Sequence, residues 1–201
     1  MSYIIKNVNE NDITLNSALW DNISSVAIDK VNWPELFPAA ITTTAKLVHN
    51  DKGIYVKFEC DEHPVHINFK HHNGEVYQDS TVEFFIAPDI NAVDYFNFEI
   101  NAEGYALIGY GSGRKRQRFS DIDFSQFNIT SNIHDAGFEL LLFVPYSFMK
   151  EYAKEVTKEL KCNLQKCCEV SGATHYLSAY PIKTEEPEFH VPQFFSDFTL
   201  E

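Results

Sequence analysis

Positive charge is scarce in this sequence, in which 16 lysines and arginines stand against 29 aspartates and glutamates over 201 residues. The formal net charge of −13 argues against nucleic acids and anionic membrane surfaces as partners, because both attract basic patches. The local exception is the basic run at residues 114–118, which follows Gly111 and Gly113. This run is either a solvated loop or a binding loop that reaches over a site, with Arg114 as a candidate ligand residue.

Long apolar runs are also missing, and none approaches the roughly 20 residues that a membrane-spanning helix needs. We therefore expect no insertion into a membrane. The first residues show neither a long apolar stretch nor a small-residue cleavage site. The expected location is the cytoplasm, or an extracellular or periplasmic space if a leader has been removed. The sequence does not predict an oligomeric state.

Cysteine is limited to four residues, and no two of them form a C-x-x-C pair. That spacing gives no signal of a zinc ribbon or a thioredoxin-type motif. We expect buried free thiols, because a disulfide between Cys162 and Cys167, or between the neighbouring Cys167 and Cys168, would require an oxidising compartment.

Familiar catalytic motifs are absent, since no G-x-S-x-G elbow, H-E-x-x-H helix or Walker loop occurs. Glu83 and Glu99 are candidates for the acid and base of a glycoside hydrolase, which stays an alternative. Any two acidic residues on one sheet face would give the same pattern. We therefore expect a protein that is not an enzyme.

Aromatic residues are plentiful at 14% of the chain, with 17 phenylalanines and 10 tyrosines, and these residue types favour strands. Apolar side chains alternate along many short segments that turn signals separate. The pattern predicts one all-β domain over residues 1–201, an antiparallel β-sandwich of jelly-roll or immunoglobulin-like type. A single short helix is expected at 145–156, where Pro145 suits the first turn. The expected strands are 53–60, 80–88, 95–101, 105–110, 137–144, 160–170, 175–182 and 198–201.

The outward faces of two neighbouring strands carry an unusual set of amides and carboxylates. Asn97, Glu99 and Asn101 share one face of the strand at 95–101, and Glu83 lies on the strand before it. Planar groups with two hydrogen-bonding positions suit adjacent sugar hydroxyls, and Tyr77 could stack on a sugar ring. The pattern fits a sugar-binding face and a polar ladder of cross-strand amides about equally well.

Two kinds of side chain, imidazoles and carboxylates, are candidate metal ligands. Four histidines lie within ten residues, and Asp61 with Glu62 and Asp121 with Asp123 form acidic clusters. Imidazoles suit zinc and carboxylates suit calcium, but no calcium-loop motif is present. We expect no cofactor, with calcium as the alternative. The histidines are His63, His66, His71 and His72.

Two segments of this sequence form a recognisable pair of motifs. Residues 76–86 read VYQDSTVEFFI and residues 95–104 read YFNFEINAEG. Together they resemble carbohydrate-binding module family 9 and its DOMON-like relatives. The C-terminal pattern of His175-Tyr176-Leu177-Ser178, Pro181, Pro187 and Phe189-His190 agrees with a family-9-like group common in Bacteroidetes.

The resemblance implies a β-sandwich that binds a terminal sugar or short oligosaccharide without hydrolysing it. It also implies a role in a system that uses polysaccharides. It implies that Tyr77 is one aromatic clamp, that Glu83 is the acidic grip and that Asn101 is an amide grip. The second clamp departs from the pattern, because Ala179 and then Tyr180 stand where the group often has tryptophan. A haem- or metal-binding DOMON-like domain is a further alternative, although its Met and His pair could use only Met1 or Met149.

Overall fold

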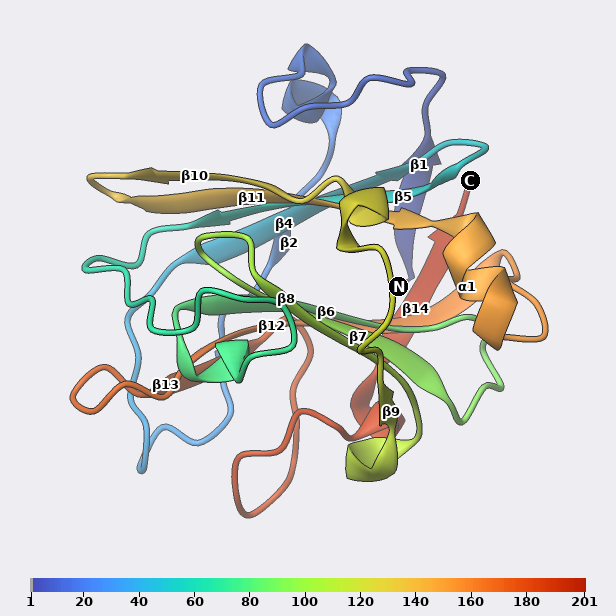
Figure 1. Ribbon diagram of the computed structural model, residues 1–201. Coiled ribbons are helices and arrows are strands. Elements are labelled where there is room, and N and C mark those ends of the chain that lie inside the picture. The colour runs from blue at the N-terminus through green and yellow to red at the C-terminus, as the bar shows by residue number, and fades with distance from the viewer. Residues whose placement is uncertain (1) are drawn as a thin grey trace.

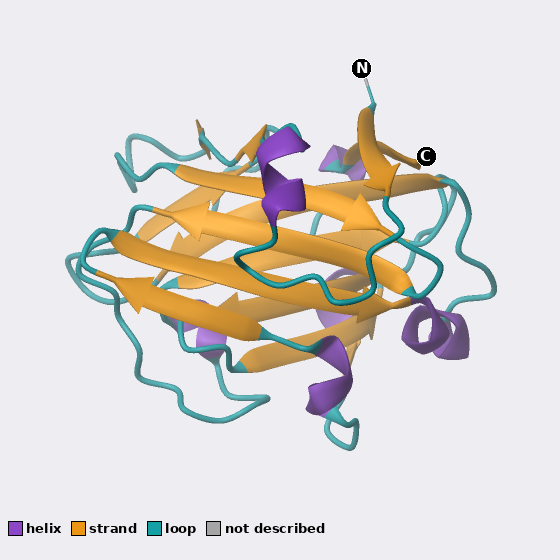
Figure 2. Cartoon of the chain, turned by 90° about the horizontal axis from the view of Figure 1, so that it is seen from above, coloured by secondary structure: helices purple, strands orange, loops and turns teal. Residues whose placement is uncertain are grey.

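The computed structural model describes residues 2–201 and shows two stacked layers of β-strands (Figure 1). Turned by 90°, the strands of the upper layer run side by side across the molecule (Figure 2). The upper layer contains, in spatial order, β10 (Thr130–His134), β11 (Gly137–Pro145), β5 (Gly53–Cys60) and β4 (Thr43–His49), with β2 (Val26–Ala27) beside β4. The lower layer contains β14 (Ser196–Leu200), β12 (Glu159–Cys168), β6 (Thr81–Ala87), β7 (Tyr95–Asn101), β8 (Ala106–Gly111) and β9 (Gln117–Arg118). At the side of β12 lie β13 (His175–Ser178) and β3 (Lys30–Val31).

The two layers are joined along one side by β1 (Tyr3–Asn7). Its first half pairs with β14 and its second half pairs with β4, and both pairings are parallel. The expected antiparallel β-sandwich is confirmed, and β1 adds two parallel pairings to it. No alternating pattern predicts this strand, because β1 is short and buries only Ile5.

Between the layers lies an apolar core that the alternating pattern predicts correctly. The inward side chains of β6 and β7 are almost fully buried, as are those of β5. Fully burying one such side chain contributes about 1.5–3 kcal/mol. The inward residues of the three strands are Ile54, Val56, Phe58, Val82, Phe84, Ile86, Phe96, Phe98 and Ile100.

The single helix α1 (Tyr146–Tyr152) covers one end of the core, to which it contributes Phe148 and Met149. It begins at Tyr146, one residue after the expected start, because Pro145 is its extended N-cap, and it ends four residues before the expected position. Ala153 is extended, and the backbone N–H of Thr157 bonds to Pro88, so tertiary contacts take over from the helix. The remaining helical elements are the short 3-10 turns η1 (Ala18–Asn22), η2 (Val76–Gln78), η3 (Gly113–Lys115), η4 (Phe124–Phe127) and η5 (Pro192–Phe194).

The expected strand at 175–182 is too long, because β13 ends at Ser178. Strands β1 to β4, β9 and β10 are additions that the sequence did not predict. All four cysteines are free and buried, as expected. Within residues 2–201, no helix has the length and apolar character needed to cross a membrane.

Candidate functional site

The outer face of the lower layer carries a row of polar side chains on neighbouring strands. Gln165 on β12 is the register partner of Glu83 on β6, which is in turn the partner of Glu99 on β7. These three residues lie on the outward face that the alternation predicts, yet they are at most 3% exposed. The polar row therefore forms the floor of a covered site.

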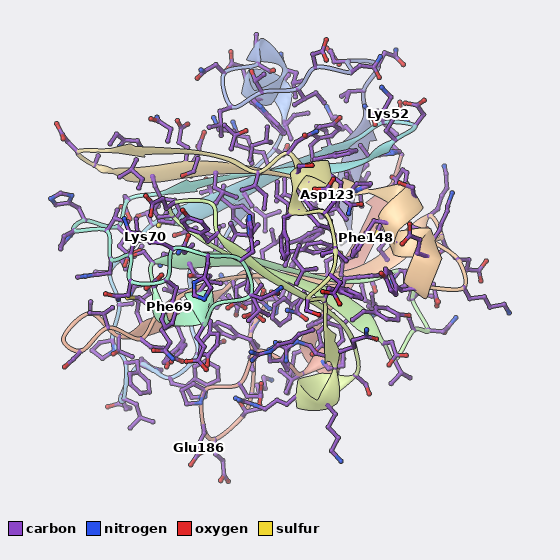
Figure 3. All side chains as sticks on the ribbon, viewed as in Figure 1. Lys52, Phe69, Lys70, Asp123, Phe148 and Glu186 are labelled. Carbon is purple, nitrogen blue, oxygen red and sulfur yellow. The ribbon has the colours of Figure 1, made fainter. Side chains whose placement is uncertain are left out.

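Two chain segments cover this floor. One is the loop from η3 to β9, and the other is the C-terminal stretch at 183–195, which lies below the lower layer in Figure 1. Glu186 marks the outer tip of that stretch in Figure 3. Between floor and cover is a cavity of ≈ 360 Å³. Its lining consists of Tyr77, Glu83, Glu99, Arg114, Arg116, Arg118, Cys167, Glu169, Tyr176, Pro187, Glu188, Phe189 and His190.

Glu83 is a buried carboxyl group without a cation of its own. Its Oε1 accepts a hydrogen bond from the thiol of Cys167 at 3.3 Å, and its Oε2 has no partner among the described residues. Burial raises the pKa of Glu83 well above its usual value, and the neighbouring charge of Glu99 adds to the rise. Glu83 therefore favours its protonated form.

Arg116 enters the site from the covering loop between η3 and β9, and the sequence did not single it out. Its Nη2 donates to Oε1 of Glu99 at 2.8 Å, and its Nε donates to Oδ1 of Asn97 at 2.5 Å. The Asn97 amide also donates to Oε1 of Glu99 at 2.8 Å. Burial raises the pKa of Glu99, while the guanidinium of Arg116 acts to lower it. The arginine thus favours ionised Glu99.

Gly109 on β8 makes room for this arginine. A Cβ atom at this position would lie 2.8 Å from Oδ1 of Asn97 and 3.4 Å from Cγ of Arg116. Real Cβ atoms do not approach an oxygen so closely, so any larger residue here would displace Asn97. The absence of a side chain at Gly109 is what lets Arg116 reach Glu99 across the sheet.

Aromatic rings and charges form the wall and rim of the cavity. Tyr176, which the sequence analysis did not select, packs edge-on against Phe37 and Trp33, and its hydroxyl donates to Glu169 at 3.0 Å. On the rim, Arg114 forms an ion pair with Glu188 at 2.5 Å. Tyr77 also lines the cavity. The cavity therefore combines tyrosine rings with groups that donate and accept hydrogen bonds.

His190 is a neutral part of the wall. It stacks on Phe85 with ring centroids 4.8 Å apart, and its Nδ1 hydrogen-bonds with the hydroxyl of Tyr95 at 2.8 Å. Burial and the nearby arginines lower its pKa to about 2. Although Nε2 lies 3.7 Å from Oε1 of Glu99, the two do not form an ion pair at neutral pH.

The structure does not bring every predicted residue to the cavity. Asn101 lies outside the lining, where its amide donates to the Phe69 carbonyl at 2.8 Å and to Asp79 at 2.9 Å. Its Oδ1 accepts from two backbone N–H groups of the β7–β8 turn. Asn97 lies beneath Arg116 and Glu99. Asn101 therefore supports the β7–β8 turn, and Asn97 supports the floor of the cavity through Arg116 and Glu99.

The second aromatic position also differs from the family pattern. Ala179 is buried between the layers, and the ring of Tyr180 packs edge-on against Phe198 at 5.8 Å. Neither residue lines the cavity. Tyr176 is the tyrosine from this part of the chain that does so.

The candidate metal ligands take other partners. Asp61 accepts from the backbone of Thr42, Glu62 contacts Lys166, and Asp123 caps η4. Within residues 2–201, no group of three or more His, Cys, Asp or Glu could hold a metal ion. Of the two methionines that the haem alternative could use, Met1 lies outside the described residues, and Met149 is buried in the core and does not line the cavity.

Replacing Glu83 by Gln is expected to raise stability at pH 8 by at least about 2 °C in Tm, which is about 1 kcal/mol for a domain of this size. Burial raises the pKa of Glu83 in the folded state. The folded protein therefore loses stability as the pH rises from the pKa of the unfolded state through that of the folded state. The amide removes that loss, so the advantage should vanish near pH 4. Thermal unfolding across this range measures it, with exposed Glu155→Gln as control. An advantage of equal size at pH 4 and pH 8 would contradict a protonated Glu83.

Comparison with known proteins gives consistent results. Residues 13–200 match the profile of carbohydrate-binding family 9. A candidate carbohydrate-binding protein from Bacteroides uniformis superimposes with a TM-score of 0.83 and 25% identity, over 100% of this chain and 99% of the other. Family 9 modules from Caldicellulosiruptor kristjanssonii, bound to cellotriose and to glucose, have TM-scores of 0.68 and 0.69 at 14% identity. These cover 100% of this chain and 94% and 96% of theirs.

No curated protein sequence matches this chain. With 188 of its residues inside the matched range of 13–200, this chain belongs to carbohydrate-binding family 9.

Proposed function

We propose that this chain binds carbohydrate without hydrolysing it, and that the cavity on the lower layer holds a terminal sugar or a short oligosaccharide. The observation that carries the proposal is the cavity itself. It places tyrosine rings beside buried carboxyl groups and a buried arginine, in a member of a carbohydrate-binding family.

The chemistry of the lining suits a sugar. Sugar rings have apolar C–H faces that pack on aromatic rings, which Tyr77 and Tyr176 supply. Sugar hydroxyls both donate and accept hydrogen bonds, and the cavity offers carboxyl groups and guanidinium groups in roughly equal number. A cavity of ≈ 360 Å³ lies near the small end of the range for ligand sites. A short ligand fits this size better than a long chain.

Titration calorimetry with a panel of monosaccharides and oligosaccharides tests the proposal. Glucose and cellotriose are included because the structurally similar Caldicellulosiruptor modules bind them. Tyr77→Ala is expected to weaken binding at least about 10-fold, or about 1.4 kcal/mol, since it removes an aromatic wall. Binding should survive chelation by EDTA, because we propose a site without metal.

The matched control is Tyr105→Ala, which removes a partly exposed tyrosine outside this cavity. Its affinity should stay within about 2-fold of the parent, as expected for a residue that does not contact the ligand. Absence of binding to every sugar in the panel would reject the proposed function. Equal weakening by the two variants would reject the cavity as its location.

The proposal includes the absence of turnover. Glu83 and Glu99 face each other on adjacent strands, as a hydrolase would require, but Arg116 and Asn97 both occupy Oε1 of Glu99. We expect no release of reducing ends from oligosaccharides that bind. Release that disappears in Glu83→Gln would instead support the hydrolase alternative. We propose that the module serves the breakdown and use of polysaccharides. By binding a glycan, it would keep either itself or a partner protein at that glycan.

A further inference from the structure

The two carboxyl groups of the floor lie side by side but have very different partners. Oε1 of Glu99 receives Arg116 Nη2 and Asn97 Nδ2, each at 2.8 Å. Oε1 of Glu83 receives only the thiol of Cys167, and its Oε2 receives nothing from the described residues. A thiol is a weak donor, whereas a guanidinium is a permanent cation. The geometry therefore favours charge on Glu99 and a proton on Glu83.

The other groups around Glu83 and Glu99 do not cancel the difference in protonation between the two carboxyl groups. Arg116 is itself buried, with a side chain only 6% exposed, so its charge acts in a poorly screened environment. It contacts Glu99 and not Glu83. The other titratable groups that face the pair, from β7, β9, β12 and the C-terminal stretch, are Tyr95, Arg118, Cys167, Glu169 and His190.

We propose that Arg116 is a positioning residue that makes the two carboxyl groups unequal, so that Glu99 presents an acceptor and Glu83 a donor to the sugar. The sugar as ligand rests on the proposed function. The difference in protonation between Glu83 and Glu99 does not depend on it. A sugar carries neighbouring hydroxyls, each of which can donate and accept. An unequal pair can engage two of them in a fixed orientation, whereas a pair with equal protonation could not.

Removing Arg116 should change which group ionises first. In Arg116→Met, Glu99 loses its cation, and a carboxyl without its cation ionises at a higher pH. Two such groups in contact then share one proton over a wide pH range. Binding at pH 5 should weaken about 10-fold, because Glu99 is then protonated and its charge-assisted hydrogen bond is lost. Arg116→Lys retains the charge and should preserve the order of ionisation.

Carbon-detected NMR of the glutamate carboxyl groups tests this on the ligand-free protein between pH 4 and pH 9. In the parent, Glu99 should titrate at lower pH than Glu83. In Arg116→Met the midpoint of Glu99 should move upward, while in Arg116→Lys it should stay below that of Glu83. Calorimetry at pH 5, 7 and 8.5 with the best sugar of the panel then measures the effect on affinity.

An unchanged Glu99 midpoint in Arg116→Met overturns the inference, as does a parent protein in which Glu83 titrates first. If Arg116→Met does not fold, Arg116→Gln removes the charge while keeping a hydrogen-bonding group, and the same shift is expected. A parent protein that binds no sugar would reject the proposed function alone, because the NMR titration still decides the role of Arg116. A changed titration with unchanged affinity would show that the sugar does not use the pair.

Discussion

Replacing Lys166 by Met is expected to lower the free energy of unfolding by about 3–5 kcal/mol, because it leaves a buried carboxylate without its cation. Lys166 is fully buried on β12, and its Nζ lies 2.7 Å from Oε2 of Glu62. The same Nζ donates to the Cys167 carbonyl at 2.8 Å and lies 2.9 Å from Nε2 of His175. Glu62 follows β5 of the upper layer, so this ion pair links the two layers.

The neighbouring His175 is held in one neutral form. Burial and the charge of Lys166 lower its pKa to about 3, and its Nδ1 donates to the Ala173 carbonyl at 2.7 Å. Its Nε2 is therefore free to accept from Lys166 at neutral pH. Three groups of different types thus surround one ammonium, which explains how a lysine can be buried here.

Chemical denaturation measures the effect of Lys166→Met. The double variant Lys166→Met with Glu62→Leu is the control, because it replaces both charges by apolar groups and should recover most of the loss. A single variant within about 1 kcal/mol of the parent would mean that the pair contributes little. A double variant as unstable as the single one would attribute the loss to packing instead of charge.

Phe98→Ala is expected to cost about 3–5 kcal/mol, since it removes a fully buried ring and leaves a cavity. The ring of Phe98 packs edge-on against those of Phe127 at 5.7 Å and Phe148 at 6.4 Å. These neighbours come from η4 and α1, so the substitution loosens three elements at once. It also loosens the inner side of β7, whose outer side carries Glu99.

Denaturation again supplies the measurement for Phe98→Ala, with Ile133→Ala as the matched control. Ile133 is an apolar residue of β10 that is 45% exposed, and its loss should change stability by no more than about 0.5 kcal/mol. Similar costs for the two variants would show that the core does not depend on this ring. The sugar affinity of the Phe98→Ala protein that remains folded would also be measured. It shows how far the floor of the cavity depends on the core packing on the inner side of β7.

Alternation along the strands was readable from the sequence because side chains of a strand point to opposite faces in turn. Phe96 and Phe98 therefore had to lie opposite Asn97 and Glu99, and the structure has them so. The motifs at 76–86 and 95–104 were sufficient to indicate the family. Tyr77 and Glu83 at the cavity follow from the same two motifs.

Contacts between distant parts of the chain were not readable in this way. The alternation did not show what covers the polar face, and the structure shows that Arg116 and the stretch at 183–195 cover it. Arg114 was selected from the basic run, yet Arg116 is the arginine that reaches the floor, through the gap that Gly109 leaves. Tyr176 was not selected because the family resemblance places the second clamp after His175-Tyr176-Leu177-Ser178, where Ala179 and Tyr180 stand.

The sequence by itself determined the β-sandwich, the family, and which face of β6 and β7 is polar, because strand periodicity and local motifs are properties of neighbouring residues. Only the tertiary structure decided that this face is the buried floor of a cavity and that its two carboxyl groups have unequal partners. The physical reason is that burial and charge pairing depend on loops separated by many residues, whose return to the sheet no local pattern encodes.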